Sequence, residues 1–204
     1  MGNQNLIYQF KIELAEIEPT IWRAIQVPSR FTFWDLHVAI QDSMGWLDYH
    51  LHVFRFKMPH HNKFTEIGIP DESLDDHKIL PGWQIPIYDY FFEPGQAAIY
   101  NYDFGDNWSH NILLQGVLLK EKGIRYPICI RGERACPPED CGGVSGYYRM
   151  IEILSNSEHP EHAEYVEWLK GHAKNYFPYE PSRFEPDKVH FWNSKKRFKM
   201  AFST

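Results

Sequence analysis

Apolar and polar residues alternate along much of the first two-thirds of the chain. In residues 8–14 every second residue is apolar, and residues 21–27 are also rich in apolar side chains. Alternation is typical of a strand with one face in the core and the other in water. We therefore expect 8–14 and 21–27 to pair as an antiparallel hairpin. The same pattern predicts further strands over 51–56, 63–67, 97–103, 110–120 and 126–131.

A different spacing marks residues 33–44, where apolar residues recur every three or four positions. That period places them on one stripe of a helix. Thr32 stands at the N-cap position with Asp35 three residues later, a pair similar to a capping box, and Gly45 supplies a left-handed stop. The sequence therefore predicts a helix over 33–44.

Helical spacing returns after residue 143. It predicts a helix over 147–154 and a second one that begins near Pro160 and stops at Gly171. Asp187 is expected to cap a last helix that runs to about Arg197.

Together these elements predict an α+β fold. Its sheet is mostly antiparallel, comes from the N-terminal two-thirds of the chain, and is packed by helix 33–44 and by the C-terminal helices. The proline-rich stretch 68–95 forms a long irregular connection, a kind of segment that often carries binding function. The absence of a soft linker favours one domain over residues 1–204. A change of composition at 132–143 leaves a helical subdomain over 144–204 as the alternative.

Composition narrows the class of protein. The 204 residues contain no apolar run long enough for a membrane span, so we expect no membrane partner. The first residues lack the basic and apolar stretches of a secretory signal, and the three cysteines form an odd count. Both observations predict a reducing, cytoplasmic location.

The formal net charge of −6 argues against broad attraction to nucleic acid. The segment 188–199 is nevertheless basic and contains Lys195, Lys196 and Arg197. These side chains either contact the phosphates of a nucleic acid or dock the last helix on the acidic body of the chain. If the chain binds DNA, replacing the three by Glu lowers the affinity and flattens its salt dependence.

Two groups of polar residues are candidates for metal or acid–base chemistry. His50 and His52 are two positions apart, so on an extended chain both imidazoles face the same side and suit one metal ion. Asp103, Asp106 and His110 surround a turn and offer carboxylates and an imidazole to a metal or a proton transfer. The structural alternative is an aromatic strand face with hydrogen-bonded histidines, and a turn whose Asp side chains bond their own backbone.

A third group is Cys136-Pro-Pro-Glu139-Asp140-Cys141-Gly-Gly143. Two prolines restrict the backbone conformation of this loop, and two glycines give the backbone more freedom just before a helix. Glu139 and Asp140 are candidate catalytic or ligand carboxylates, or they cap that helix. Cys136 is a candidate nucleophile if His50 or His110 lies beside it. The sequence has no phosphate-binding loop, no nucleophile elbow and no His-Glu-x-x-His metal motif.

These blocks, in this order, resemble the plasmid pRiA4b open-reading-frame-three-like family, whose members include passenger proteins of bacterial insertion sequences. The matching segments are Trp22-Arg23, Gly45-Trp46 with His50, His52 and Phe54, Tyr102-Asp103-Phe104-Gly105-Asp106 with Trp108 and His110, Cys136-Pro-Pro-Glu139-Asp140, and Phe184-x-Pro186. The resemblance covers nearly the whole chain. It implies an α+β fold and an association with mobile DNA elements, and it implies no established activity.

The leading hypothesis is a cytoplasmic binding or accessory protein whose blocks form one cleft rimmed by Trp46 and Trp108. The alternative is a metal-dependent hydrolase that uses the same cleft. A divalent metal is then held by His50, His52 and His110, with Asp103, Asp106, Glu139 or Asp140 as ligand or general base. A third hypothesis is a purely structural polar network. The cleft exists only if segments far apart in the sequence lie together in the fold.

Overall fold

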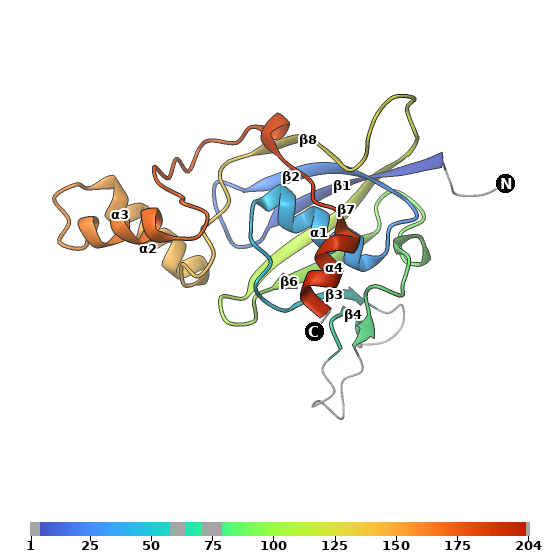
Figure 1. Cartoon of the computed structure of the whole chain (residues 1–204), viewed down its shortest axis with the longest axis horizontal. Coiled ribbons are helices and arrows are strands. Elements are labelled where there is room, and N and C mark those ends of the chain that lie inside the picture. Colours follow the sequence, from blue (N-terminus) through green and yellow to red (C-terminus); the bar gives the residue numbers. More distant parts are fainter. Residues whose placement is uncertain (1–4, 58–63, 71–78, 203–204) are drawn as a thin grey trace.

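The computed structural model describes residues 5–57, 64–70 and 79–202. Within them, eight strands form one sheet in the order β5-β4-β3-β6-β7-β1-β2-β8 (Figure 1). The strands are β1 Leu6–Leu14, β2 Trp22–Pro28, β3 His52–Lys57, β4 Phe64–Gly68, β5 Leu80–Pro81, β6 Ala97–Tyr102, β7 Trp108–Leu119 and β8 Ile128–Glu133. All neighbouring strands are antiparallel except β4 and β5, which confirms the mostly antiparallel sheet.

The alternation along the strands decides which face of the sheet is buried. Phe10 of β1 lies opposite Ile25 of β2 and Leu114 of β7, and none of the three is exposed. Helix α1 (Phe33–Met44) packs on this face, so the core forms between α1 and the sheet (Figure 1). The predicted hairpin is confirmed as the pair β1–β2.

Helix α1 begins and ends where the sequence predicts. The Asp35 N–H donates to the Thr32 hydroxyl (3.2 Å), and the Thr32 N–H donates to the Asp35 carboxylate (2.9 Å), so the capping box is complete. Gly45 has a φ of 89°, and its N–H donates to the Gln41 carbonyl. Local signals at both ends are therefore sufficient to define this helix.

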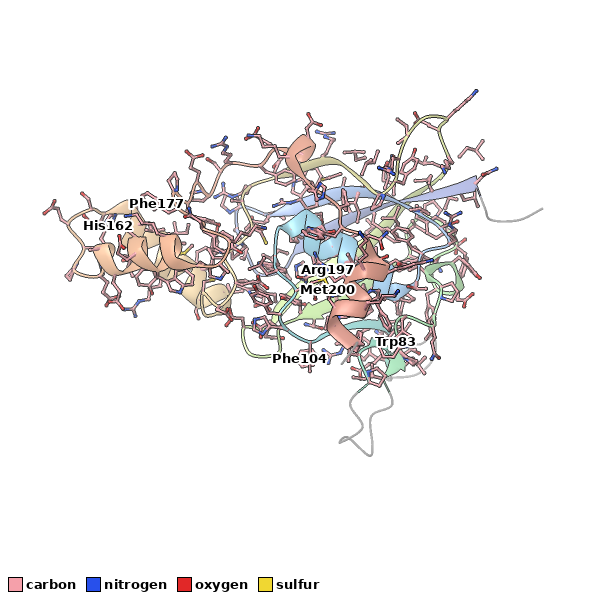
Figure 2. The ribbon with its side chains drawn as sticks, in the orientation of Figure 1. Trp83, Phe104, His162, Phe177, Arg197 and Met200 are labelled. Carbon is pink, nitrogen blue, oxygen red and sulfur yellow. The ribbon has the colours of Figure 1, made fainter. Side chains whose placement is uncertain are left out.

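Helices α2 (Gly143–Ser155) and α3 (His162–Gly171) form a projection at one end of the molecule (Figure 1). Figure 2 shows His162 and Phe177 on this projection, whereas Arg197 and Met200 lie on α4 over the body. Buried side chains of the projection still belong to the same cluster as those of the sheet, namely Tyr147, Met150 and Leu169. The projection is thus anchored in the main core.

The last helix differs from the prediction. Asp187 lies in a short 3-10 turn, η3 (Pro186–Lys188), and the α-helix α4 runs over Ser194–Phe202. The Lys196 N–H donates to the Asn193 side chain at 3.0 Å, so Asn193 caps the helix. The expected helix from Asp187 to Arg197 is therefore wrong at both ends.

Within the irregular connection 68–95, the described residues form β5 and one 3-10 turn, η2 (Ile87–Asp89). The residues His60-His61-Asn62-Lys63 predict a turn between β3 and β4, and this prediction lies outside the described residues, as do residues 71–78. Among the described helices, none combines the length and apolar character that crossing a bilayer requires.

Candidate functional site

Three candidate residues from three separate blocks meet at one corner of the molecule. His50 precedes β3, Asp103 follows β6, and Asp140 lies in the loop before α2. The His50 Nε2 atom is 3.1 Å from an Asp140 carboxylate oxygen and 3.6 Å from an Asp103 carboxylate oxygen. One ligand atom from each residue lies within 4.8 Å of the other two. An imidazole and two carboxylates at this spacing are able to share one cation.

The backbone at this corner aims the two carboxylates. Asp103 and Asp140 both adopt left-handed conformations, with φ of 56° and 59°. One Asp103 oxygen accepts the Gly105 N–H at 2.9 Å, which leaves the other oxygen facing His50. Asp is among the few residues that tolerate this conformation, and its short side chain bonds the turn. The turn therefore positions Asp103 without consuming both of its oxygens.

Exposure increases across the cluster. The Asp103 side chain is 9% exposed, that of His50 is 29% exposed and that of Asp140 is 56% exposed. The His50 Nε2 atom itself is shielded from solvent and makes no hydrogen bond within the described residues, although it lies within ion-pair distance of Asp140 and Asp103. A shielded nitrogen that faces two carboxylates without a hydrogen bond suits coordination of a cation.

A small cavity of about 240 Å³ adjoins the cluster. Asp140 and Cys141 line one side of it, and Glu164, Tyr165 and Trp168 of α3 line the other. The cavity provides an apolar and aromatic wall next to the most exposed carboxylate. A group bound at the cluster therefore has room to extend toward α3.

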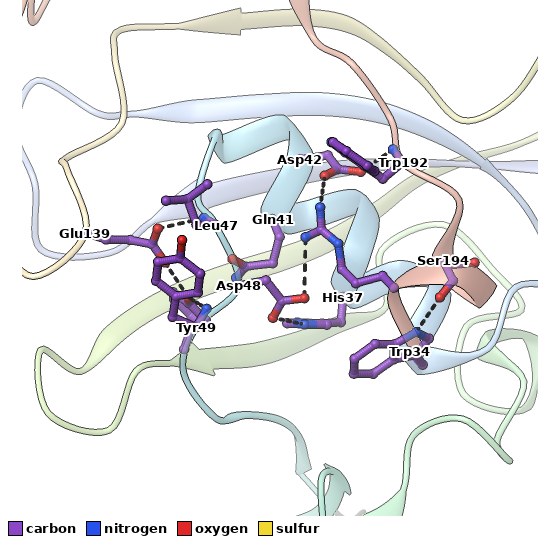
Figure 3. A network of polar contacts seen from close by, with 12 residues as sticks. Trp34, His37, Gln41, Asp42, Leu47, Asp48, Tyr49, Glu139, Trp192 and Ser194 are labelled. Carbon is purple, nitrogen blue, oxygen red and sulfur yellow. Dashed lines mark hydrogen bonds and ion pairs between the residues drawn. The ribbon is translucent and has the colours of Figure 1, made fainter. Parts of the chain in front are cut away.

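Glu139 ties the loop before α2 to the segment before β3. It is 1% exposed and accepts a hydrogen bond from the Leu47 N–H at 2.6 Å (Figure 3). It also accepts one from the Tyr102 hydroxyl at 2.5 Å. Burial and this bond to Glu139 raise the pKa of Tyr102 well above its usual value. Both Glu139 oxygens are thus engaged by protein groups.

Two further contacts hold the same loop. The Trp46 indole N–H donates to the Pro137 carbonyl at 2.9 Å, and the Gly142 N–H donates to Asp106 at 3.1 Å. Gly143 approaches the Asp106 carbonyl so closely that a Cβ there would lie 2.6 Å from its oxygen. Only glycine allows the loop to reach the β6–β7 turn at this distance.

Trp46 and Trp108 are not at the rim of an open cleft. They are 3% and 1% exposed, and Trp46 stacks on Tyr102 with ring centroids 5.0 Å apart. This position corrects the expectation of an exposed aromatic rim. The reason is that Trp108 begins β7 on the face covered by the core, and Trp46 follows α1 directly into it.

Cys136 is 8% exposed, and burial raises the pKa of its thiol to about 12. A thiol with this pKa stays protonated at neutral pH, and the protonated form is a poor nucleophile. No hydrogen bond joins Cys136 to His50 or His110 in the described part of the chain.

His52 and His110 lie in the core, apart from the His50 cluster. His52 is 1% exposed and stacks on His37 of α1, with ring centroids 3.5 Å apart and planes 8° apart. His110 is not exposed and faces the Tyr100 carbonyl at 3.3 Å. Among the described residues, one group of three side chains could hold a metal ion, and it contains neither His52 nor His110. Residues two apart face the same side only within an extended strand. His50 lies before β3, so its side chain is not aligned with that of His52.

A second polar network was not predicted from the sequence. His37 contacts the Tyr100 hydroxyl at 2.8 Å. It also contacts the Asp48 carboxylate at 2.7 Å (Figure 3). Asp48 in turn lies 3.4 Å from Arg197 of α4. The available signal was the position of His37 four residues after Phe33, on the buried stripe of the predicted helix.

Comparison with known proteins places this chain. A sequence model of the family described as Plasmid pRiA4b ORF-3-like protein matches residues 6–188. The chain belongs to this family. It is 32% identical over 163 residues to an uncharacterized protein, y4hQ, of Sinorhizobium fredii, a match that covers 79% of this chain and 80% of that protein. The resemblance inferred from the sequence blocks is confirmed.

A solved relative supports the fold. A protein of unknown function from Methanosarcina mazei Go1, MM3350, is 40% identical to this chain and superposes with a TM-score of 0.79. The match covers 92% of this chain and 99% of that protein. None of these names states an activity.

Helix α4 lies beyond the residues matched by the pRiA4b ORF-3-like family model. The Trp34 indole N–H donates to the Ser194 carbonyl at 3.0 Å, and Arg197 pairs with Asp42 at 3.0 Å. Arg197 thus turns inward, whereas Lys195 and Lys196 are exposed. The basic segment 188–199 was expected either to contact nucleic-acid phosphates or to dock the last helix on the body of the chain. The contacts of Arg197 are those of a docked helix.

Proposed function

We propose that this pRiA4b ORF-3-like chain is a binding protein that holds a divalent cation between His50, Asp103 and Asp140. The observation that carries the proposal is the approach of one imidazole nitrogen and two carboxylate oxygens, from three separate segments, within 4.8 Å of one another. The mixed nitrogen and oxygen donors suit Zn²⁺, Mn²⁺ or Fe²⁺ better than Mg²⁺ or Ca²⁺, which prefer oxygen alone.

Three protein ligands leave coordination positions open to a further ligand. The adjoining cavity of about 240 Å³ is where such a ligand would extend. The cation would bind an anionic or carbonyl oxygen of that ligand, and the aromatic wall of α3 would contact its apolar part. Recognition of a small ligand through a bound cation is therefore the function that the geometry supports best.

The open positions also favour a second function, metal-assisted hydrolysis, because a coordinated water loses its proton more readily. Such a reaction needs a general base beside the cation. Glu139 is engaged by Leu47 and Tyr102, so this role falls to Asp106, of which one oxygen is bonded by Gly142. His52 and His110 have no ligand role in either function.

A nucleic-acid partner is not part of the proposal. Arg197 is paired with Asp42 and Asp48, which leaves Lys195 and Lys196 as the exposed members of the predicted patch, on a chain of net charge −6. A cellular role as an accessory protein of mobile DNA elements rests on the plasmid origin in the family's name alone.

Calorimetric titration with Zn²⁺ and Mn²⁺ tests the cation site. We expect one site per chain, and an affinity that falls by about tenfold or more in Asp140→Asn, which keeps the shape and the left-handed conformation of the residue but removes its charge. Asp89→Asn, at an exposed position in η2, is the control and is expected to bind as the natural chain does. Equal affinities in Asp140→Asn and the natural chain would exclude the site.

Turnover separates the two candidate functions. The cation-loaded chain is assayed on p-nitrophenyl phosphate and p-nitrophenyl acetate. A rate that requires the cation and is lost in both Asp140→Asn and Asp106→Asn assigns hydrolysis. Tight cation binding without turnover assigns ligand recognition.

A further inference from the structure

A second concentration of charge lies outside the cluster of His50, Asp103 and Asp140. A cavity of about 550 Å³ separates the C-terminal end of α1 and the loop after β8 from the segment 174–192. Its volume is in the range of small-molecule sites. Five cationic side chains and three carboxylates line it. The lining therefore carries a surplus of two positive charges.

The carboxylates of this cavity are already paired. Glu180 and Glu185 bind Arg183, Glu185 also binds Lys188, and Asp42 binds Arg197. Within the described part of the chain, no ion pair joins a carboxylate to the other two cations, Arg23 and Lys174. Burial lowers the pKa of Lys174, and Glu139 and Asp42 act against this shift without forming an ion pair with Lys174. Among the described residues, Arg23 and Lys174 are therefore the two cations of the cavity that lack a directly paired carboxylate.

Arg23 is the unusual member, because it is only 1% exposed. Its guanidinium donates to the carbonyls of Ser43, Trp22 and Glu133 through Nε and Nη1. The Nη2 group makes no hydrogen bond within the described residues. Burial lowers the pKa of Arg23, and the groups that oppose this shift are the side chains of Cys136, Cys129 and Tyr179. A buried cation of this kind gains from an anion placed beside it.

The packing around Arg23 is specific. The Phe184 ring lies over the guanidinium, with 3.6 Å from its central carbon to the ring centroid. Gly132 lies opposite Arg23 across the β2–β8 pair, and a Cβ there would lie 2.5 Å from the Phe184 ring. Two sequence blocks that the cation site does not use, Trp22-Arg23 and Phe184-x-Pro186, therefore meet at this cavity.

Lys174 and Trp192 mark the outer part of the cavity. The Lys174 ammonium donates to the Gly45 carbonyl, and a Cβ on Gly45 would lie 3.0 Å from the Lys174 Nζ atom. Trp192 also lines the cavity and is 59% exposed, although the Arg197 guanidinium lies 6.0 Å from its ring centroid and the His190 ring meets it edge-on at 6.1 Å. Cations beside an exposed aromatic ring are the combination that binds an anion attached to a planar ring.

We propose that this cavity binds a small organic anion, a phosphate or carboxylate carried on a planar ring, with Arg23 and Lys174 holding the anion and Trp192 stacking on the ring. The ligand class corresponds to that of a nucleoside monophosphate or an aromatic carboxylate. The site is separate from the His50 cluster and needs no cation.

Calorimetric titration in the presence of a chelator tests the proposal, because the chelator removes divalent cations and so prevents binding of the probes through a cation. The probes are AMP, 4-hydroxybenzoate and inorganic phosphate. We expect AMP or 4-hydroxybenzoate to bind one site per chain, and the arm that responds identifies the anion as phosphate or carboxylate. Inorganic phosphate is expected to bind more weakly, because it lacks the ring.

Three variants locate the site. Lys174→Met is expected to weaken binding of the responding probe by about tenfold or more, because it removes one of the two cations that hold the anion. Lys170→Met removes the same charge four residues away, outside the cavity, and is expected to bind as the natural chain does. Trp192→Ala is expected to weaken the ring-bearing probe by about fivefold or more and to leave inorganic phosphate unchanged.

The proposal is overturned if none of the three probes binds at millimolar concentration. It is also overturned if Lys174→Met and Lys170→Met bind equally well, since binding would then lie elsewhere. Both substituted lysines are exposed, so these variants are expected to remain folded and to give a clear answer.

Discussion

Glu139 joins the three segments that carry His50, Asp103 and Asp140, the ligands of the proposed cation site. Its two oxygens accept hydrogen bonds from the Leu47 N–H and the Tyr102 hydroxyl, and it is 1% exposed. The bond to Leu47 fixes the segment that leads into His50, and the bond to Tyr102 fixes the strand end that leads into Asp103. The loop before α2, the segment before β3 and the end of β6 therefore share one buried carboxylate.

Glu139→Ala is expected to lower the free energy of unfolding by about 2–4 kcal/mol, because it leaves two buried donors without partners. Urea denaturation measures this loss. Glu164→Ala, at an exposed position of α3, is the control and is expected to change stability by less than about 0.5 kcal/mol. A Glu139→Ala chain as stable as the control would mean that the carboxylate does not join the three segments.

His110 gives the chain a specific sensitivity to acid. It is fully buried, and burial lowers its pKa to about 4, whereas an unfolded histidine titrates near 6.5. Between these two pH values His110 is protonated in the unfolded chain but not in the folded chain. The free energy of unfolding therefore falls as the pH falls through this window, by about 1.4 kcal/mol per pH unit from this residue.

His110→Gln is expected to remove that part of the pH dependence. The measurement is urea denaturation of both chains at pH 7, 5.5 and 4.5. The difference in stability between them is expected to shift in favour of the variant as the pH falls below about 6.5, and to be constant above it. Parallel pH profiles would show that His110 is protonated in the folded chain.

At the scale of elements, α4 is held by charge as well as by packing. Arg197 pairs with Asp42 and Asp48, whose side chains are 3% and 9% exposed. Phe198 and Phe202 contact the rings of Trp34 and Trp83. Within the described residues, removing the arginine therefore leaves the shielded Asp42 without an ion-pair partner and leaves Asp48 with His37 alone.

Arg197→Met is expected to lower the free energy of unfolding by about 3 kcal/mol and to make α4 accessible to protease. Lys199→Met, at an exposed position of the same helix, removes the same charge and is expected to do neither. The readouts are urea denaturation and limited proteolysis with mass spectrometry of the fragments. Resistance of Arg197→Met to protease would show that the aromatic contacts alone hold α4.

Elements with strong local signals were predictable from the sequence. Helix α1 carries a cap at each end and one apolar stripe, and its predicted bounds are confirmed. The start of α4 was missed because Asp187 and Asn193 are both plausible caps. Which of them begins the helix depends on docking against α1, a contact that a local pattern does not contain.

The sequence predicted which residues are candidates for the site, but not which of them lie together. His50, Asp103 and Asp140 were candidates because of their residue types, but so were His52 and His110. Whether a histidine lies in the core or at the corner depends on where its strand starts. His52 is the first residue of β3 and faces the core, whereas His50 lies before the strand and stays partly exposed.

At the scale of the whole molecule, the fold brings together segments that the sequence separates. Strands β3, β6 and β7 are neighbours, which places His50 beside Asp103. Asp140 arrives from β8 at the far edge of the sheet, through a loop that contacts the β6–β7 turn at Gly142 and Gly143. This return of the loop is a tertiary feature that has no signal in residue spacing.

One continuous core predicts one unfolding event. Met150 of α2 and Leu169 of α3 belong to the same buried cluster as Phe10 of β1 and Ile40 of α1. Urea denaturation followed by tryptophan fluorescence and by far-ultraviolet circular dichroism is expected to give coincident transitions. Two separate midpoints would indicate that residues 144–204 unfold as an independent helical subdomain.

Anomalous X-ray scattering from a zinc-soaked crystal is the sharpest test of the proposed cation site, which three distant segments of the chain build. We expect an anomalous peak about 2.0–2.2 Å from His50 Nε2 and from one oxygen each of Asp103 and Asp140. We also expect the peak to be lost in Asp140→Asn. A peak at other residues, or none at this corner in crystals soaked at saturating zinc, would rule the site out.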